Sequence, residues 1–286
     1  MITQDQFNTE IELIITNAIR EDVGDGDHSS LACIPAEATG KAKLLVKDNG
    51  IIAGVELAKK VFAYVDKDLK VETLITDGSP VKHGDIVFYV EGSSQSILKA
   101  ERLVLNAMQR MSAIATKTKE FVNLLEGTGT KILDTRKTTP GIRALEKWAV
   151  KIGGGENHRF ALYDMIMLKD NHIDFAGGIT KAIEKTKQYL KDTNRDLKII
   201  VEARNLDEIA EILKTDGVYR ILIDNFNYQD TKKAVALIGD QCLTESSGGI
   251  NEQTIRNYAE CGVNFISSGA LTHSVYNMDL SLKAVK

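Results

Sequence analysis

Four polar residues recur at a fixed interval in the C-terminal half of the chain, each near the end of an apolar run rich in β-branched residues. Steps of 22 residues separate Glu202, Asp224, Ser246 and Ser268. A strand, a loop, a short helix and a return loop fit into that length. Repeated β–α units place their strands parallel in one sheet. The interval therefore predicts a series of β–α units, and enough of them close into a barrel.

Six apolar runs carry this pattern, and all lie beyond residue 130. They are KILDTRK (131–137), MIMLKDN (165–171), KIIVEAR (198–204), RILIDNF (220–226), CLTESSGG (242–249) and NFISSGA (264–270). The alternative architecture, an open doubly wound sheet, has a glycine-rich turn after its first strand. Here the glycine-rich turns follow the last two runs, where barrels often hold a phosphate group. The sequence favours a barrel over the open sheet.

The N-terminal part of the chain has a different pattern. Residues 3–20 carry apolar side chains at helical spacing, and residues 24–30 (GDGDHSS) predict a loop after that helix. Short apolar runs separated by turn signals fill residues 38–95, with one helical segment at 55–66. This pattern predicts a small α+β unit with an antiparallel sheet. Residues 96–125 predict a long helix or a helix pair.

Composition narrows the class of protein. There are 36 basic and 40 acidic residues, and the pI is 5.8, which argues against a general nucleic-acid binder. No apolar run approaches the roughly 18 residues needed to span a bilayer. The opening MITQDQFNTEIEL has acids where a signal peptide has bases. Three cysteines without C-x-x-C spacing argue against a structural zinc site. We expect a cytoplasmic protein with no membrane or nucleic-acid partner.

Cationic side chains follow the first two apolar runs, and active sites of barrels form at the carboxyl ends of strands. These cations are Arg136, Lys137, His158, Arg159, Lys169 and His172. Arginine grips carboxylates and phosphates with paired hydrogen bonds, whereas lysine acts as a point charge. Cations gathered at one barrel mouth repel each other unless an anion lies between them. The sequence therefore predicts a ligand with several negative charges.

Two carboxylates, Glu202 and Asp224, end consecutive central strands of the predicted barrel. Such a pair holds Mg²⁺ together with waters and phosphate oxygens, or accepts hydrogen bonds from sugar hydroxyls. The alternative is that both form internal salt bridges with the neighbouring cations. The two arrangements are compatible, one before and one after a ligand binds.

Two loops of small residues follow the last two strands, 246–249 (SSGG) and 267–270 (SSGA). Small residues expose backbone N–H groups, and the N-terminus of a helix favours an anion. A helix is predicted from about Asn251, directly after the first loop. Taken together, the residues predict a cytoplasmic α/β barrel enzyme that binds a phosphorylated, strongly anionic ligand with Mg²⁺.

Several strings of the chain resemble the quinolinate phosphoribosyltransferase family, also called nicotinate-nucleotide pyrophosphorylase (carboxylating). They are ERLVLNAMQRMSAIAT (101–116), DTRKTTPGIRALEKWAVKIGGGENHR (134–159), MLKDNHI (167–173), VEARNLDE (201–208), LIDNF (222–226), ESSGGI (245–250) and SSGALTHS (267–274). The early REDVGDGDHSS is similar to an opening element of the family. The order DTRKT-x-P-G-x-R, GGG-x-NHR and KDNH is very specific, and the strings cover nearly the whole chain.

The resemblance implies transfer of a phosphoribosyl group from phosphoribosyl pyrophosphate (PRPP) to the ring nitrogen of quinolinate. Pyrophosphate and carbon dioxide leave, and nicotinate mononucleotide is formed for NAD synthesis. It also implies Mg²⁺ as cofactor and a homodimer with shared active sites, which assembles further in some members. The implied fold is type II phosphoribosyltransferase-like. It has an open α/β sandwich at 1–112, onto which 272–286 pack, and a partial, seven-stranded α/β barrel at 113–271.

The resemblance also implies roles for individual residues. Quinolinate is bound by Arg136, His158, Arg159 and Lys169, with Arg102 reaching in from the partner subunit and Glu101 in support. PRPP and its phosphate are bound by Lys137, Glu202, Asp224, Ser247, Gly248, Gly249, Ser268, Gly269 and Ala270. The catalytic group comprises Lys137, Lys169, Glu202 and Asp224, of which Glu202 and Asp224 hold Mg²⁺ directly or through water.

Three alternative functions stay open at this point. Nicotinate phosphoribosyltransferase shares the implied fold but takes a monocarboxylate, which the surplus of cations disfavours. A Schiff-base lyase would use Lys169 as its nucleophile, although Asp170 and His172 adjoin that lysine and a nucleophilic lysine prefers an apolar pocket. A binding protein without catalysis would keep the ligand site and lack turnover.

Overall fold

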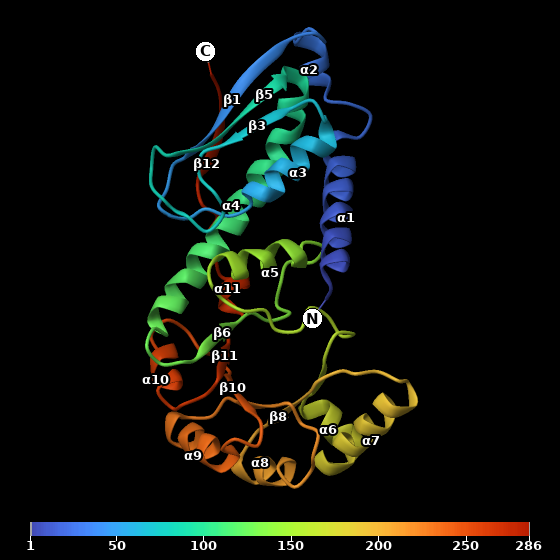
Figure 1. Cartoon of the computed structure of the whole chain (residues 1–286), viewed down its shortest axis with the longest axis vertical. Coiled ribbons are helices and arrows are strands. Elements are labelled where there is room, and N and C mark those ends of the chain that lie inside the picture. The colour runs from blue at the N-terminus through green and yellow to red at the C-terminus, as the bar shows by residue number, and fades with distance from the viewer. Residues whose placement is uncertain (1, 286) are drawn as a thin grey trace. The chain divides into compact units, whose positions relative to one another are not determined.

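The computed structural model describes residues 2–285, which form two compact units (Figure 1). The barrel unit comprises Glu120–Lys137 and Gly155–Ala270, and the antiparallel unit comprises Thr3–Lys119, Thr138–Gly154 and the chain from Leu271. The boundary expected between residues 112 and 113 falls inside one helix, α4 (Ser94–Leu124). The domain limits that the resemblance implies therefore stay a prediction.

One parallel sheet forms the centre of the barrel unit. Its strands are β6 (Lys131–Leu133), β7 (Ile166–Leu168), β8 (Ile199–Ala203), β9 (Arg220–Asp224), β10 (Leu243–Ser247) and β11 (Phe265–Ser267). They lie in the order β6-β11-β10-β9-β8-β7, so the first strand pairs with the last. The sheet is open between β6 and β7. This is an incomplete barrel, which confirms the predicted fold class.

Within residues 2–285 this sheet has six strands, one fewer than the resemblance implies. They correspond to the six apolar runs. On the open side of β6, a single parallel bridge joins Leu133 to Glu156. Pairing stops there because the next two residues bond to a side chain instead of a strand. The Asn157 side-chain amide and the His158 backbone N–H both donate to the carboxylate of Asp134.

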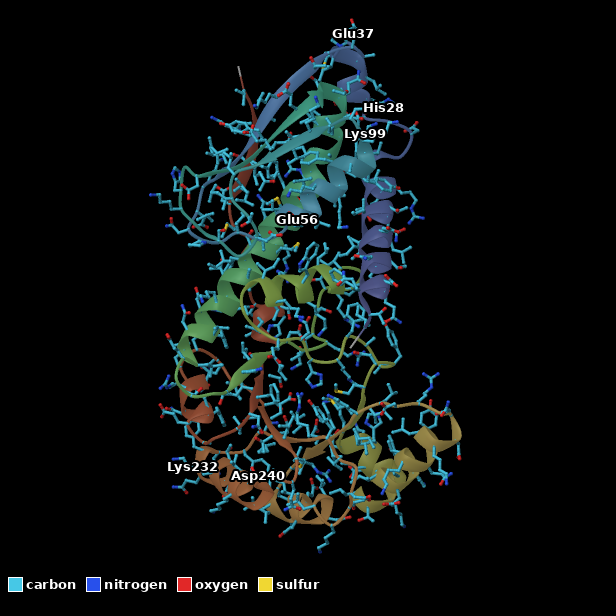
Figure 2. All side chains as sticks on the ribbon, viewed as in Figure 1. His28, Glu37, Glu56, Lys99, Lys232 and Asp240 are labelled. Atoms are coloured by element: carbon cyan, nitrogen blue, oxygen red, sulfur yellow. The ribbon has the colours of Figure 1, made fainter. Side chains whose placement is uncertain are left out.

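Helices follow the strands of the barrel unit: α6 (Asp170–Ala176), α7 (Ile179–Asp192), α8 (Leu206–Ile212), α9 (Tyr228–Ile238) and α10 (Ile255–Ala259). The α9 helix is amphipathic, with Ala234 and Ile238 buried. The exposed Lys232 on α9 and Asp240 just after it lie on the outer side (Figure 2). The prediction of a helix from about Asn251 is wrong. The Asn251 side chain accepts the backbone N–H of Gln253 and forms a turn, so α10 begins only at Ile255.

Side chains of the central strands alternate between an inner and an outer face of the sheet, because successive residues of a strand point to opposite sides. Strand register assigns the outer face to Ala203, Ile221, Ile223, Ser246 and Ile266, all fully buried. The inner face carries Met167, Ile200 and Leu222, which pack together with Met165. It also carries Glu202, Arg220, Asp224, Glu245 and Ser247. The interior is therefore both apolar and charged.

The antiparallel unit contains a four-stranded sheet in the order β12-β1-β5-β3. Its strands are β1 (Thr39–Val46), β3 (Lys70–Thr73), β5 (Ile86–Ser93) and β12 (Leu280–Ala284), and β2 (Gly50–Ile51) pairs separately with β4 (Pro80–Val81). The predicted antiparallel sheet is confirmed. The pairing of β12 with β1 joins the two ends of the chain in one sheet.

Four helices besides α4 belong to the antiparallel unit: α1 (Gln4–Val23), α2 (His28–Cys33), α3 (Val55–Val65) and α5 (Arg143–Ile152). The α2 helix was not predicted. Its first N–H groups are capped by Asp27, whose carboxylate accepts the N–H of Ser30. Ring contacts join Phe62 of α3 to Phe88 of β5 and Phe7 of α1 to Trp148 of α5. No helix within residues 2–285 is both long and apolar enough to cross a membrane.

The first glycine of the triple-glycine motif is required by packing. Gly153 follows α5, and a Cβ atom there would collide with the Ala115 carbonyl oxygen and the Thr118 side chain of α4. Only glycine lets the two helices approach this closely. The motif therefore secures a helix contact in the antiparallel unit just before the chain returns to the barrel unit.

Candidate active site

Lys169 and Glu202 meet at the carboxyl ends of β7 and β8. Lys169 is the N-cap residue of α6, and its backbone N–H donates to His172 Nδ1 at 3.0 Å. Its Nζ donates to Glu202 Oε2 at 2.9 Å. The lysine side chain is 48% exposed and the glutamate side chain only 7%. The internal salt bridge considered for these acids is thus formed, between a buried carboxylate and an accessible cation.

Asp224 ends β9 beside Ser247 of β10. Ser247 Oγ donates to Asp224 Oδ1 at 2.5 Å, and the Asn225 side-chain amide donates to Oδ2 at 2.6 Å. The Gly248 backbone has φ +101°, and a Cβ atom there would collide with the Asn225 side chain. Glycine therefore lets the loop after β10 lie directly against the end of β9. Asp224 itself is half-buried and keeps lone pairs for a ligand.

The two loops of small residues lie side by side. Ser268 Oγ, after β11, donates to the carbonyl oxygen of Ile250, which follows the SSGG loop, at 3.1 Å. The N–H of Ala270 donates in turn to Ser268 Oγ at 3.3 Å. The helices after these loops, α10 and α11 (Ala270–His273), have five and four residues. Any phosphate here would be held by loop N–H groups rather than by a long helix.

Two arginines of the site repel each other. Arg136 is exposed, whereas Arg159 is buried and donates from its guanidinium to the Met165 carbonyl oxygen at 3.1 Å. Burial and the nearby charge of Arg136 lower the pKa of Arg159, and Asp164 opposes them in part. The two guanidinium groups are thus close enough to favour an anion near them. Lys137, next along the chain, is exposed, and its backbone N–H donates to Thr135.

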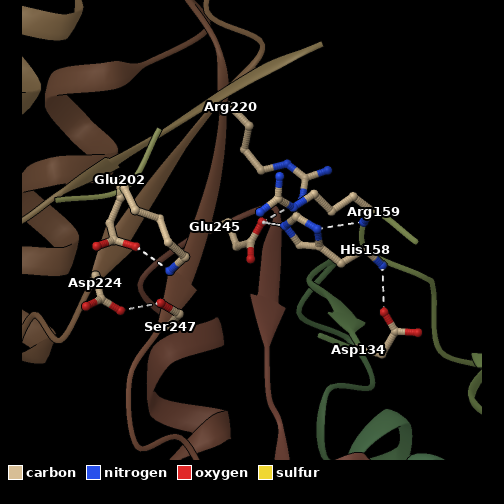
Figure 3. A network of polar contacts seen from close by, with 9 residues as sticks. Asp134, His158, Arg159, Glu202, Arg220, Asp224, Glu245 and Ser247 are labelled. Atoms are coloured by element: carbon tan, nitrogen blue, oxygen red, sulfur yellow. Dashed lines mark hydrogen bonds and ion pairs between the residues drawn. The ribbon is translucent and has the colours of Figure 1, made fainter. Parts of the chain in front are cut away.

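A buried charged network lies on the inner face of the sheet, and two of its three residues, Arg220 and Glu245, were not predicted from the sequence (Figure 3). Glu245 Oε2 accepts from an Arg220 guanidinium nitrogen at 2.6 Å and lies 3.4 Å from His158 Nε2. Arg220 also stacks over the ring of Phe265, 4.2 Å from its centroid. Burial raises the pKa of Glu245, but His158 and Arg220 outweigh it and lower that pKa to about 2.

The structure thus assembles most of the predicted residues. Two pairs lie at the strand ends, Lys169 with Glu202 and Asp224 with Ser247. Figure 3 shows Glu202, Asp224 and Ser247 near the network of Glu245. Arg102 and Glu101 belong to α4 of the antiparallel unit, where Arg102 is exposed.

The carboxylates of the site suit a magnesium ion only in part. Mg²⁺ prefers oxygen ligands, keeps several waters, and is often held by one or two carboxylates together with substrate phosphates. Glu202 and Asp224 offer such oxygens. Among residues 2–285, no group of three or more His, Cys, Asp or Glu side chains is placed to hold a metal by itself. The donor set fits an ion that arrives with a phosphorylated substrate.

Comparison with known proteins gives matches over nearly the whole chain. Residues 114–283 match the family model "Quinolinate phosphoribosyl transferase, C-terminal domain", and residues 27–112 match the corresponding N-terminal domain. The chain is 43% identical to a mitochondrial quinolinate phosphoribosyltransferase [decarboxylating] of Nicotiana glauca, over 96% of this chain and 82% of that one. It is 38% identical to a probable nicotinate-nucleotide pyrophosphorylase [carboxylating] of Bacillus subtilis, over 96% and 93%.

A solved structure is similar along its full length. The crystal structure of NadC from Streptococcus pyogenes superimposes with a TM-score of 0.89 at 35% identity, covering 100% of this chain and 99% of that chain.

Proposed function

Because the chain belongs to the quinolinate phosphoribosyltransferase family, we propose that the strand ends of its barrel unit bind quinolinate and PRPP side by side. The enzyme transfers the phosphoribosyl group of PRPP to the ring nitrogen of quinolinate, with decarboxylation, and forms nicotinate mononucleotide for NAD synthesis. The placement of substrates is the proposal. It rests on one observation, the pairing of Lys169 with Glu202 beside the pairing of Asp224 with Ser247.

The cations bind the two adjacent carboxylates of quinolinate. Burial and the charge of Arg136 lower the pKa of Arg159, and a dicarboxylate near the two guanidinium groups would relieve this repulsion. His158, buried beside Arg159, supports this side of the site from within the chain, because both of its ring nitrogens face other protein groups. Lys169 is half-exposed and can turn from Glu202 to a substrate carboxylate.

The acids and the small-residue loops bind PRPP. When Lys169 turns to quinolinate, Glu202 loses its partner and can accept hydrogen bonds from ribose hydroxyls, as Asp224 does on the next strand. The loops at Ser247–Gly249 and Ser268–Ala270 hold the 5′-phosphate through backbone N–H groups. Lys137 lies in the loop that follows β6, where it can reach an anionic group of either substrate. Binding of one substrate thus prepares the residues for the other.

Glu202 and Asp224 would hold a magnesium ion that comes with PRPP, directly or through water. When bound, it neutralises the charge that develops on the departing pyrophosphate. The residues of the chain contribute mainly by bringing two polyanions together in a fixed geometry, which alone removes a large part of a barrier. After the ring nitrogen is alkylated it is cationic, so the carbanion left by departing carbon dioxide is stabilised beside it and takes up a proton. No side chain is required as a general base.

The active enzyme is proposed to be a homodimer in which Arg102 of one subunit completes the quinolinate site of the other. Arg102 is exposed on α4 and thus accessible to a second copy. Mixing an Arg102→Ala variant with a Lys169→Ala variant tests this arrangement, because one intact site can form in each mixed dimer. Recovery of activity is expected, and no recovery after verified subunit exchange contradicts a shared site.

The expected cytoplasmic location stays a prediction.

The substrate assignment is tested by turnover with PRPP and Mg²⁺, using carboxyl-labelled quinolinate in one reaction and nicotinate in another. Labelled carbon dioxide together with nicotinate mononucleotide is expected from quinolinate only. Product from nicotinate instead would overturn the dicarboxylate site. An adduct trapped at Lys169 by borohydride with a carbonyl compound would support the lyase alternative instead.

A further inference from the structure

Burying the charged network of Arg220, Glu245 and His158 is unfavourable for folding, so we expect the network to serve a function. All three side chains are buried, and Glu245 has no exposed surface. Removing charged groups from water carries a penalty of several kcal/mol per ion, and replacing a buried ion pair with apolar residues is often neutral or stabilising. Barrel interiors are usually filled by branched apolar side chains. Stability alone does not account for these charges.

Contacts around His158 define the state of its ring. The backbone N–H of Arg159 donates to His158 Nδ1 at 2.6 Å, and a backbone N–H can only donate. The Nδ1 atom therefore keeps its lone pair, and the ring proton lies on Nε2. That nitrogen faces Glu245 Oε2 at 3.4 Å. The carboxylate is thus suited to favour one tautomer and one orientation of the ring.

The same ring is connected to a residue of the proposed quinolinate site. Its hydrogen bond to the Arg159 N–H holds the backbone of the arginine, and the Arg159 guanidinium is held separately by the Met165 carbonyl oxygen. On the other side, the His158 backbone N–H donates to Asp134 at 2.8 Å. A continuous series of contacts therefore leads from Arg220 through Glu245 and His158 to Arg159 (Figure 3).

We propose that Glu245, held in place by Arg220, is a positioning residue that fixes the ring of His158 with its proton on Nε2 and so holds Arg159 for the carboxylates of quinolinate. The inference rests on the proposed function, in which Arg159 binds quinolinate. Under this proposal, Glu245 and Arg220 act from inside the barrel without touching either substrate. His158 connects them to Arg159.

The test compares two ways of removing the carboxylate. Glu245→Gln leaves an uncompensated Arg220 and is expected to unfold more easily. The double variant Glu245→Met with Arg220→Met removes both charges and keeps comparable volume, so it is expected to fold with a melting temperature near that of the unmodified enzyme. In this double variant the KM for quinolinate should rise about tenfold or more, and that for PRPP should change less than about twofold. Arg159→Ala serves as the reference for a lost quinolinate contact.

The His158 ring supplies a readout that a purely structural role does not move. Long-range proton–nitrogen NMR of the histidine rings, with His158→Gln to assign the signals, should show protonated Nε2 in the unmodified enzyme. In the double variant the Arg159 N–H still donates to Nδ1, so the proton stays on Nε2, but the Nε2 signal should shift because no carboxylate faces it. A folded double variant with unchanged quinolinate KM and an unchanged His158 Nε2 signal overturns the inference. If Arg159→Ala leaves the quinolinate KM unchanged, the proposed site fails instead, and the two failures are thereby distinguished.

Discussion

The barrel unit contains two kinds of charged contact, and they differ in exposure. At the strand ends, Lys169 pairs with Glu202 while the lysine side chain stays 48% exposed. Inside the sheet, Arg220 pairs with Glu245, and the two side chains are 7% and 0% exposed. In each pair a basic side chain contacts a glutamate, and the nitrogen–oxygen distances are similar. The first can be exchanged for contacts with a ligand, whereas the second cannot be opened without burying an unpaired charge.

This difference separates binding from positioning. An accessible pair at a strand end costs little to open, because solvent or substrate replaces the lost partner. A buried pair keeps its neighbours in one arrangement throughout the reaction. We therefore expect substitutions at the strand ends to affect activity more than stability. Substitutions inside the sheet that leave one charge unpaired should affect stability more than activity.

The largest effect is expected from Lys169→Ala. Loss of the cation that pairs with a quinolinate carboxylate should lower kcat/KM about 10³-fold, which corresponds to roughly 4 kcal/mol. The free energy of unfolding should fall by about 2 kcal/mol, because Glu202 is only 7% exposed and loses its partner; this is less than the roughly 3–5 kcal/mol typical of breaking a fully buried pair. Steady-state kinetics and urea unfolding measure the two quantities. Lys232→Ala, on the outer side of α9, is the matched control and should change neither.

Near-native turnover of the Lys169→Ala variant would contradict the assignment of the strand ends as the active site. A large loss of stability in it would instead remove the distinction between the two kinds of pair.

Acid should act next most strongly, and through the interior pair. The pKa of Glu245 is lowered from 4.5 to about 2 in the folded chain, so the unfolded chain binds more protons between these values. The resulting stabilisation is present above about pH 4.5 and is lost as the pH falls towards 2. Its size is roughly 3 kcal/mol. Unfolding measured across this pH range should show the loss, and the double variant Glu245→Met with Arg220→Met should show less of it.

An exposed carboxylate provides the control for this pH dependence. Asp216 also has a lowered pKa, caused by its hydrogen bond with Lys187, but its side chain is 89% exposed. Asp216→Asn should therefore leave the acid profile as it is in the unmodified protein. If Asp216→Asn and the double variant weakened the pH dependence of the free energy of unfolding equally, the interior pair would not be its source.

Gly248→Ala should have an intermediate effect at the strand ends. The added Cβ would collide with the Asn225 side chain, whose amide holds Asp224, and φ at this position is +101°. We expect the KM for PRPP to rise about tenfold, since the loop and the carboxylate both shift. Gly239→Ala in the loop after α9, where φ is also positive but no atom lies within 4 Å, is the control for backbone strain alone. Equal KM values for the two variants would contradict the role of the loop.

Ser246→Ala should have the smallest effect, and in the direction of greater stability. Ser246 lies on the outer face of β10 between Ile223 and Ile266 and is fully buried. Its hydroxyl has no hydrogen-bond partner among residues 2–285. Removing it should raise the free energy of unfolding by about 1 kcal/mol. The KM for PRPP should not change, because the opposite face carries Ser247 and the site. A changed PRPP KM would place Ser246 in the phosphate loop after all.

The sequence predicted the barrel because its signal is local and repeated. Each apolar run forms its strand, and the polar residues at the 22-residue interval lie near the strand ends, where Glu202 pairs with Lys169. It did not reveal the short helix α2, which is capped by the Asp27 side chain, or the turn at Asn251 that precedes the start of α10 at Ile255. The seventh strand was expected from resemblance, and only the bridge at Glu156 corresponds to it.

The interior pair was missed for a different reason. Glu245 lies two residues before Ser247, so period-two alternation places both on the inner face. That signal was available in the sequence. What the sequence could not supply is that His158 also faces Glu245. Arg220 comes from the neighbouring strand β9, whereas His158 comes from a segment outside the repeated units. Register and closure of the sheet decide that contact.

Two strand pairings join segments that lie far apart in the sequence, and they affect how the chain folds during synthesis. Leu44 of β1 pairs with Leu282 of β12. In the barrel unit, β6 pairs with β11, and most of the sequence of that unit lies between the two strands. Such distant contacts slow folding, because a long loop must close before they form. During synthesis, β1 and β6 must each wait, with an unpaired edge, for a partner strand that is made much later. Removing the final strand would therefore expose the β1 edge and favour aggregation in newly made chains.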